Sequence, residues 1–358
     1  MKLITKHESK SKLKNLRFTK SILTIAILLS GINAIAQTEG EEKKNKLSIS
    51  GSVDAYYQSY LSTSDDLDQS FGTAFAEQSG FALGMGNLIV SYEGEKIGAV
   101  LDLVSGPRGA AATFNSDIID GIVNQAYVYW NVSEGTKLTM GRFNTFLGYE
   151  VISPAANFNY STSYLFSNGP FSHLGLKADF TLSDDFSLML AIMNPWDTND
   201  VSTTGEYSLG AQIGYSGQYL NFYYDSGNYG GLGFEVDYTG GFDLSDSFFL
   251  GINGAYQTSD DQGFYGAALY PQLATSDSFS IGLRGEYFGY HSKDFDDLPS
   301  VFATTLTASY TIENLIIKPE IRLDSWSNVD NNEPYVNSKG EAANSLSAFT
   351  LAAIYKFD

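Results

Sequence analysis

Charged side chains recur at every second position in several stretches of the sequence, with apolar residues such as Leu283 and Ile321 between them. They are Asp102, Lys177, Asp179, Arg284, Glu286, Lys318, Glu320, Arg322 and Asp324. Alternate residues of an extended segment share a face, so one face here needs water and the other an apolar medium. We interpret these residues as candidates for the lining of a water-filled pore. They would either pair with one another and solvate its wall, or set a transverse field that selects solutes.

Hydrolytic and metal chemistry find little support in the sequence. Beyond the first 36 residues the only histidines are His173 and His291, and Ser172 adjoins His173, on the opposite face of an extended segment. The acidic pairs at 65–66, 260–261 and 296–297 lack the spacing of a calcium loop, although weak cation bridging to lipid headgroups stays open. We therefore predict no enzyme activity, no metal and no cofactor.

The segment 149–172 is the longest expected loop, and it is too aromatic for an ordinary surface loop. We single out Asn157, Phe158, Asn159, Tyr160, Tyr164 and Phe166 as candidates for a constriction. Folding inward would bury the rings against a barrel wall and narrow its lumen. The alternative is that the rings cap the outer rim or pack on a neighbouring protomer.

The elements that must position these residues are strands, because the hydrophobic period is 2 almost everywhere after Lys46. We expect about 16 of them, within a range of about 14 to 18. They lie near 46–60, 81–93, 96–104, 121–132, 137–148, 173–182, 185–194, 206–215, 218–225, 231–240, 247–257, 263–270, 278–288, 300–311, 314–325 and 345–357. At Pro319, which cannot donate to a ladder, we expect a bulge.

The connections between these segments alternate in length. Tight turns such as 93–96, 133–136 and 216–217 alternate with long polar segments such as 105–120 and 326–344. Short turns at one end and long loops at the other are typical of a transmembrane up-and-down antiparallel β-barrel, with short periplasmic turns and long extracellular loops. We therefore predict an all-β fold of this kind.

Aromatic residues favour the barrel over a large soluble β-sandwich. The chain holds 24 Tyr and 24 Phe but only 17% charged residues. Many rings lie near the expected strand ends, as in the aromatic girdles of barrels, although some of them must face the lumen or lie in loops. These are Tyr56, Tyr57, Tyr92, Tyr127, Tyr129, Trp130, Tyr223, Tyr224, Tyr287 and Tyr310.

Residues 1–36 are typical of a secretory signal peptide, with a basic start, a short apolar run at 22–29 and Ala34-Ile35-Ala36 before a cleavage point at Gln37. We expect a flexible lead-in at 37–45 and a barrel at 46–358. Cleavage would leave 14 basic against 40 acidic residues, a formal charge near −26 that argues against nucleic acid. The chain has no Cys, which excludes disulfides and a lipoprotein anchor.

Several short motifs, weak singly, carry a resemblance through their order. They are Asn87-Leu88-Ile89-Val90-Ser91-Tyr92-Glu93-Gly94-Glu95-Lys96, Gly141-Arg142-Phe143, Leu147-Gly148-Tyr149-Glu150, Asn159-Tyr160-Ser161-Thr162-Ser163, Phe166, Gly169-Pro170-Phe171, Gly175 and Met193-Asn194-Pro195-Trp196. From about residue 46 to the C-terminus the chain resembles the OmpL-like family of outer-membrane β-barrel porins. Thr162 stands where we expect a basic residue and Pro195 where Gly is usual. The resemblance implies a porin-like barrel and no catalytic residues.

We therefore expect a porin-like channel in the outer membrane of a Gram-negative bacterium, for passive diffusion of small hydrophilic solutes or ions. The alternative is a non-conducting barrel with a structural, adhesion or receptor role. Expected partners are outer-membrane lipid and lipopolysaccharide, the barrel-assembly machinery through the C-terminal strand, and the solutes themselves. Whether the protein is a homotrimer stays open.

Overall fold

The structure is a computed structural model that describes residues 45–63, 69–114, 120–198, 205–228, 231–329 and 333–358. The predicted signal peptide at 1–36 lies outside the described residues, as does the lead-in at 37–45 except for Asn45. Residues from Asn45 to Asp358 form one compact unit.

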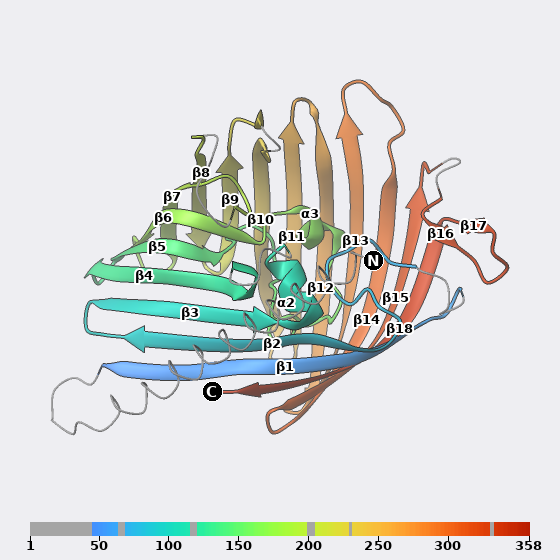
Figure 1. Cartoon of the computed structure of the whole chain (residues 1–358), viewed down its shortest axis with the longest axis horizontal. Helices are drawn as coiled ribbons and strands as arrows, with labels where there is room; N and C mark the ends of the chain where they lie inside the picture. Colours follow the sequence, from blue (N-terminus) through green and yellow to red (C-terminus); the bar gives the residue numbers. More distant parts are fainter. Residues whose placement is uncertain (1–44, 64–68, 115–119, 199–204, 229–230, 330–332) are drawn as a thin grey trace, which may run out of the picture. The chain divides into compact units, whose positions relative to one another are not determined.

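Sixteen strands close into one antiparallel barrel (Figure 1), which confirms the predicted fold. Their bounds are Lys46–Tyr60 (β1), Gly80–Glu93 (β2), Ile97–Ser105 (β3), Val123–Ser133 (β4), Thr136–Asn144 (β5), Ser172–Thr181 (β6), Phe186–Met193 (β7), Ser208–Tyr215 (β8), Gln218–Tyr224 (β9), Phe234–Ser245 (β10), Phe248–Ser259 (β11), Gln262–Ser276 (β12), Phe279–Ser292 (β13), Ser300–Ile312 (β14), Leu315–Ser327 (β15) and Ser345–Phe357 (β18). Each strand pairs with its neighbours in sequence, and β1 closes on β18 from Gly51↔Phe357 to Tyr60↔Ala348.

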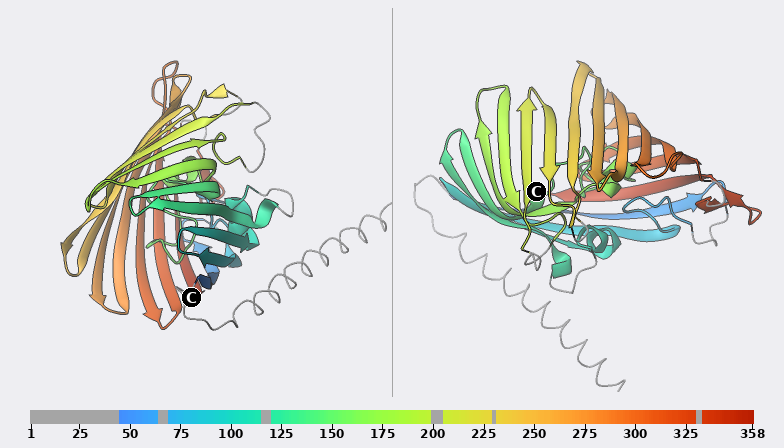
Figure 2. Two further views of the ribbon diagram at one scale, coloured as in Figure 1. Left: turned by 90° about the vertical axis from the view of Figure 1, so that its left-hand side faces the viewer. Right: turned by 90° about the horizontal axis from the view of Figure 1, so that it is seen from above.

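Smaller elements lie in the connections. They are α2 (Gly106–Ala112), the 3-10 turn η1 (Asp120–Ile122), α3 (Tyr164–Asn168) and a two-stranded ribbon of β16 (Tyr335–Val336) and β17 (Ala342–Ala343). Figure 2 shows α2 and α3 on the concave side of the curved sheet. None of the described helices has the length and apolar character needed to cross a membrane.

Turn chemistry sets the short connections. Ser216 and Gly217 both have positive φ, 47° and 79°, as the favoured two-residue hairpin turns require. One connection at the long-loop end is equally short: Asp260 and Asp261, at φ 50° and 63°, join β11 to β12 directly. No long loop therefore extends from the barrel at this hairpin.

The two faces of the wall follow the predicted alternation. On β13, Leu283 is 38% exposed on the outside while Arg284 is fully buried on the inside. On β15, Ile321 is 49% exposed while Arg322 is buried. The outer face is therefore apolar and the inner face polar, as a barrel in lipid requires.

Exposed aromatic residues flank this apolar outer face. Phe279 and Tyr287 on β13, and Phe302 and Tyr310 on β14, are exposed pairs whose members lie eight residues apart. That spacing is about 26 Å along a strand, which at a tilt of about 40° spans about 20 Å of the about 25 Å apolar band of outer-membrane barrels. Two of the predicted girdle residues, Tyr56 and Tyr223, are instead buried inside the barrel.

The bulge predicted at Pro319 is wrong. Pairing of β15 with β14 keeps one register from Thr307↔Glu320 to Tyr310↔Ile317, and Pro319 pairs in register with Leu351 of β18. The missing N–H interrupts the ladder to β14 locally, but no additional residue is needed to accommodate it.

Candidate functional site

The connection of β5 to β6, residues 145–171, runs inside the barrel. Its side chains reach strands that are remote from β5 in the sheet. Asn159 donates from Nδ2 to Thr307 Oγ1 of β14 (2.7 Å), and the Tyr164 hydroxyl donates to Asp324 of β15 (2.8 Å). The predicted loop 149–172 falls almost wholly within this segment, which we call the inner loop.

Two wall carboxylates accept backbone N–H groups of the inner loop. Glu320 of β15 accepts from Tyr160 (2.7 Å) and Ser161 (3.1 Å). Glu286 of β13 accepts from Tyr164 (3.0 Å) and Leu165 (2.8 Å), the first residues of α3. Helix-initial N–H groups have no intrahelical partner, so a buried carboxylate there satisfies both groups.

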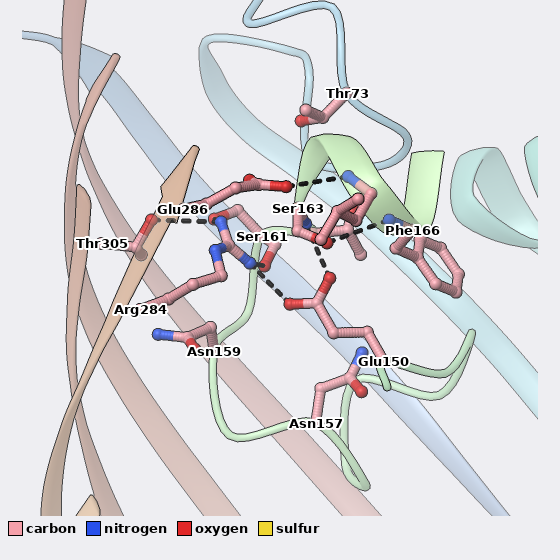
Figure 3. A network of polar contacts seen from close by, with 12 residues as sticks. Thr73, Glu150, Asn157, Asn159, Ser161, Ser163, Phe166, Arg284, Glu286 and Thr305 are labelled. Atoms are coloured by element: carbon pink, nitrogen blue, oxygen red, sulfur yellow. Dashed lines mark hydrogen bonds and ion pairs between the residues drawn. The ribbon is translucent and has the colours of Figure 1, made fainter. Parts of the chain in front are cut away.

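A buried ion pair joins the wall to the beginning of the inner loop (Figure 3). Arg284 Nη1 of β13 lies 2.6 Å from Glu150 Oε1, with side chains 0% and 3% exposed. The guanidinium also donates to the Ser161 carbonyl (2.7 Å) and to Thr305 Oγ1 (3.1 Å), while Glu150 accepts from Ser163 N (2.7 Å). Breaking such a pair on one side leaves an uncompensated buried charge.

Further wall cations donate to backbone carbonyls of the same loop. The ammonium of Lys318 lies 2.9 Å from the Pro154 oxygen and also binds the Asn157 oxygen. Arg322 donates to the Thr162 carbonyl (3.0 Å). Cations from one wall thus hold the loop at several points along its length.

The opposite side of the inner loop rests on α2. Arg108 donates from Nε to the Ile152 carbonyl (3.1 Å) and from Nη2 to the Tyr160 carbonyl (3.2 Å), and its guanidinium lies 4.5 Å from the centre of the Phe75 ring. The Tyr160 hydroxyl donates to Asp54 of β1 (2.5 Å). The loop, which leaves β5 and returns to β6, thus crosses the lumen and contacts β13–β15, β1 and α2.

Rings complete the packing. Phe166 stacks on Phe171 at 4.9 Å, and Phe75 packs on both. A Cβ at Gly282 would lie 2.4 Å from the Phe158 ring, so only glycine lets that ring lie against β13. The aromatic residues singled out from the sequence thus all lie inside the barrel, buried or half-buried.

The return of the inner loop to β6 is held by Asp197 of the β7–β8 connection. Its carboxylate accepts from Phe171 N and Ser172 N, both at 2.8 Å. Burial raises the pKa of Asp197 to about 7, opposed by these backbone hydrogen bonds and by the charge of Arg142. This carboxyl is a titratable group at the base of the loop.

The nine predicted pore-lining charges do not share one environment. Those of β13 and β15, namely Arg284, Glu286, Lys318, Glu320, Arg322 and Asp324, are buried and bind the inner loop or one another. Asp102 of β3 is buried among the amides of Asn87, Asn124 and Gln125. Lys177 and Asp179 of β6 form an ion pair at 3.2 Å, with side chains 26% and 35% exposed. Of the nine, only this pair has substantial access to solvent.

Sequence reasoning missed Glu150, Arg108 and Asp54, which the structure places in the same network. A signal existed for Asp54, a charge in the middle of the first strand, on the inward parity. Glu150 ends the motif Leu147-Gly148-Tyr149-Glu150, which gave it no role, and nothing local marks Arg108; the partners of both residues lie far away in sequence. No group of three His, Cys, Asp or Glu side chains suited to a metal occurs among the described residues.

A closed barrel of 16 antiparallel strands, apolar outside and polar inside, with a loop held within it, defines an outer-membrane β-barrel of the porin type. Residues 46–357 match the model of the family described as "Putative beta-barrel porin-2, OmpL-like". The chain belongs to that family, which confirms the resemblance found in its motifs.

Solved structures show the same fold at low identity. An anion-selective porin from Comamonas acidovorans is 10% identical, with a TM-score of 0.55 over 88% of this chain and 100% of that one. OmpT of Vibrio cholerae in its trimer form is also 10% identical, with a TM-score of 0.51 over 88% and 100% of the two chains. No curated protein sequence matches.

Proposed function

We propose that the protein is a passive channel for small hydrophilic solutes or ions and that the inner loop forms its constriction. The observation that carries the proposal is the fixation of this loop across the lumen by buried charges of β13, β15 and α2. A barrel of this strand number encloses a wide lumen, so a fixed loop inside it sets the size of what passes. The partly exposed pair Lys177–Asp179 is the part of the predicted lining that we assign to the aqueous path.

The proposal includes the setting of the channel. We infer export through cleavage before Gln37, insertion through the C-terminal strand by the barrel-assembly machinery, and contact of the apolar band with outer-membrane lipid and lipopolysaccharide. A homotrimer is the assembly we favour, because the Vibrio cholerae barrel with this fold has a trimer form. We propose that the protein has no catalytic activity.

Planar-bilayer recording tests the proposal and separates it from the rival function, a non-conducting structural, adhesion or receptor barrel. Folded wild-type protein should give reproducible conductance steps. Deletion of residues 154–168 should raise single-channel conductance and relax the size cutoff for neutral polymers, because the loop would no longer narrow the lumen. Deletion of residues 338–341 in the exposed β16–β17 turn is the matched control and should change neither. Absence of steps from correctly folded protein would favour the rival function.

A further inference from the structure

A pocket of about 410 Å³ opens at the long-loop end of the barrel, separate from the hydrogen bonds that hold the inner loop. Adjacent ends of β11, β12 and β13 form its back wall, and loops and the end of α3 form its sides. The residues that matter here are Gln257, Phe264 and Tyr290 on the strands, and Asn168, Trp196 and Phe295 around them.

Contacts outside the pocket hold its walls in place. Lys293 binds Asp261 at the tip of the β11–β12 hairpin, with Nζ and Oδ2 2.8 Å apart, and Tyr290 N donates to the Pro299 carbonyl (3.1 Å). Together these contacts fix both ends of the 293–299 loop that carries Phe295. On the other side, Trp196 N donates to the Tyr223 hydroxyl (3.0 Å). The pocket is therefore built by a framework that a ligand need not organise.

The described part of the lining is mostly apolar, with a few polar groups and no formally charged side chain. Among the described residues that line the pocket there is no Asp, Glu, Lys or Arg, although the chain as a whole has a formal net charge of −20. A charged ligand would lose water here without gaining a counter-ion, which is unfavourable. The occupant that fits is neutral.

Ring faces and amide groups further restrict the chemical class of the ligand. Phe264 is buried in the wall while Phe295 is 67% exposed, so rings are presented both at depth and at the mouth. Asn168, Gln257 and Gln262 carry amides, which both donate and accept hydrogen bonds. Gln257 and Asn168 already donate to the carbonyls of Leu232 and Tyr164. The polar groups that face a ligand are therefore the exposed amide of Gln262 and the hydroxyl of Ser292, and a purely apolar ligand that covered them would remove their water without replacing its hydrogen bonds. A sugar has apolar C–H faces and hydroxyl edges, and thus matches both kinds of lining.

We propose that this pocket binds neutral mono- or disaccharides at the outer mouth of the barrel. Its volume lies in the range of small-molecule sites. The role of the pocket in uptake rests on the proposed channel function, since a site at the mouth raises the local concentration of a solute above the constriction. Binding itself does not depend on conduction.

Calorimetric titration of the folded protein tests the proposal, in a detergent without a sugar headgroup so that the solvent does not compete. Maltose and galactose should bind saturably, and galacturonate should bind at least about tenfold more weakly than galactose because it carries a charge. Phe295→Ala should weaken maltose binding about tenfold. Tyr207→Ala removes an exposed ring that is not part of the pocket and should leave binding unchanged.

The substitutions are chosen to preserve folding. Phe295 is in an exposed loop and Gln262 is exposed at the start of β12, so Gln262→Ala serves as a second variant that should also weaken maltose binding. No saturable binding of either neutral sugar, equal binding of galacturonate and galactose, or equal losses in Phe295→Ala and Tyr207→Ala would each overturn the proposal. Sugar binding without conductance would overturn the proposed channel function but not the sugar site. Conductance without sugar binding would overturn the sugar site but not the channel function.

Discussion

The Glu150→Gln substitution should release the inner loop without unfolding the barrel. The amide keeps the shape of the side chain but removes the charge that lies 2.6 Å from Arg284 Nη1. Arg284 would keep neutral hydrogen-bond partners, among them the Ser161 carbonyl and Thr305 Oγ1, and the charge of Glu286 nearby. Removing one member of a buried pair costs about 3–5 kcal/mol, so the ratio of seated to released loop should fall about 100-fold or more.

Two measurements report this release. Protease added from the long-loop side should cut the inner loop far faster in Glu150→Gln, and single-channel recordings should show larger, noisier currents. The matched control is Lys177→Met, which breaks the partly exposed ion pair with Asp179. It should change the free energy of loop release, as measured by the cleavage rate, by under about 1 kcal/mol.

A double-mutant cycle decides whether the ion pair is the cause. Arg284→Met alone should release the loop as Glu150→Gln does, because it leaves the carboxylate buried and unpaired. In the double variant, most of the inner loop should again be held inside the barrel, since neither buried charge remains. If the two effects simply add, or if cleavage and current match those of the wild type, the loop is not held by this pair and the reasoning fails.

Four further results are expected. Leu283→Lys and Ile321→Lys place charge on the outer face and should each destabilise the barrel by about 2–4 kcal/mol if near the midplane, measured by denaturant titration in lipid; equal stability would mean that the wall faces are misassigned. Since the pKa of Asp197 is raised from 3.8 to about 7, the folded state holds a proton that the unfolded state loses, so resistance of the inner loop to protease should fall as pH rises from about 4 to about 7, and the fall should be shallower in Asp197→Asn. Asp179→Lys should shift reversal potentials toward anions, and an unchanged potential would place this position outside the ion path. Terminal sequencing of the membrane-embedded protein should begin at Gln37.

Strand positions could be predicted because the signal is local. On β15 the alternation of Leu315, Ile317, Ile321 and Leu323 with charged residues sets both the element and its faces, since one apolar and one polar face suit only one orientation in the wall. Pro319 misled the prediction of a bulge because a missing donor removes one hydrogen bond without changing the register.

The environment of the inward charges could not be predicted. The alternation along their strands predicts that Glu286 and Glu320 face inward. It does not predict that Glu286 binds Tyr164, 122 residues away along the chain, or that Glu320 binds Tyr160, 160 residues away. From the sequence alone, we expect carboxylates that face a water-filled lumen to tolerate substitution by Lys. The structure implies that these two would not, because each accepts two backbone N–H groups in a buried place.

Closure of the barrel between β1 and β18 imposes an order on assembly. The pairs from Gly51↔Phe357 to Tyr60↔Ala348 join the two ends of the chain, so the seam cannot form until the last strand has emerged. The partners of the inner loop on β13–β15 are likewise made long after the loop itself. A segment tethered at both ends by β5 and β6 is most easily captured while the sheet is still open. Most strand pairs are local, so the slow steps of folding should be the few pairings of high sequence separation, namely the seam and the contacts of the inner loop, and a seam that closes early should trap the loop outside the wall.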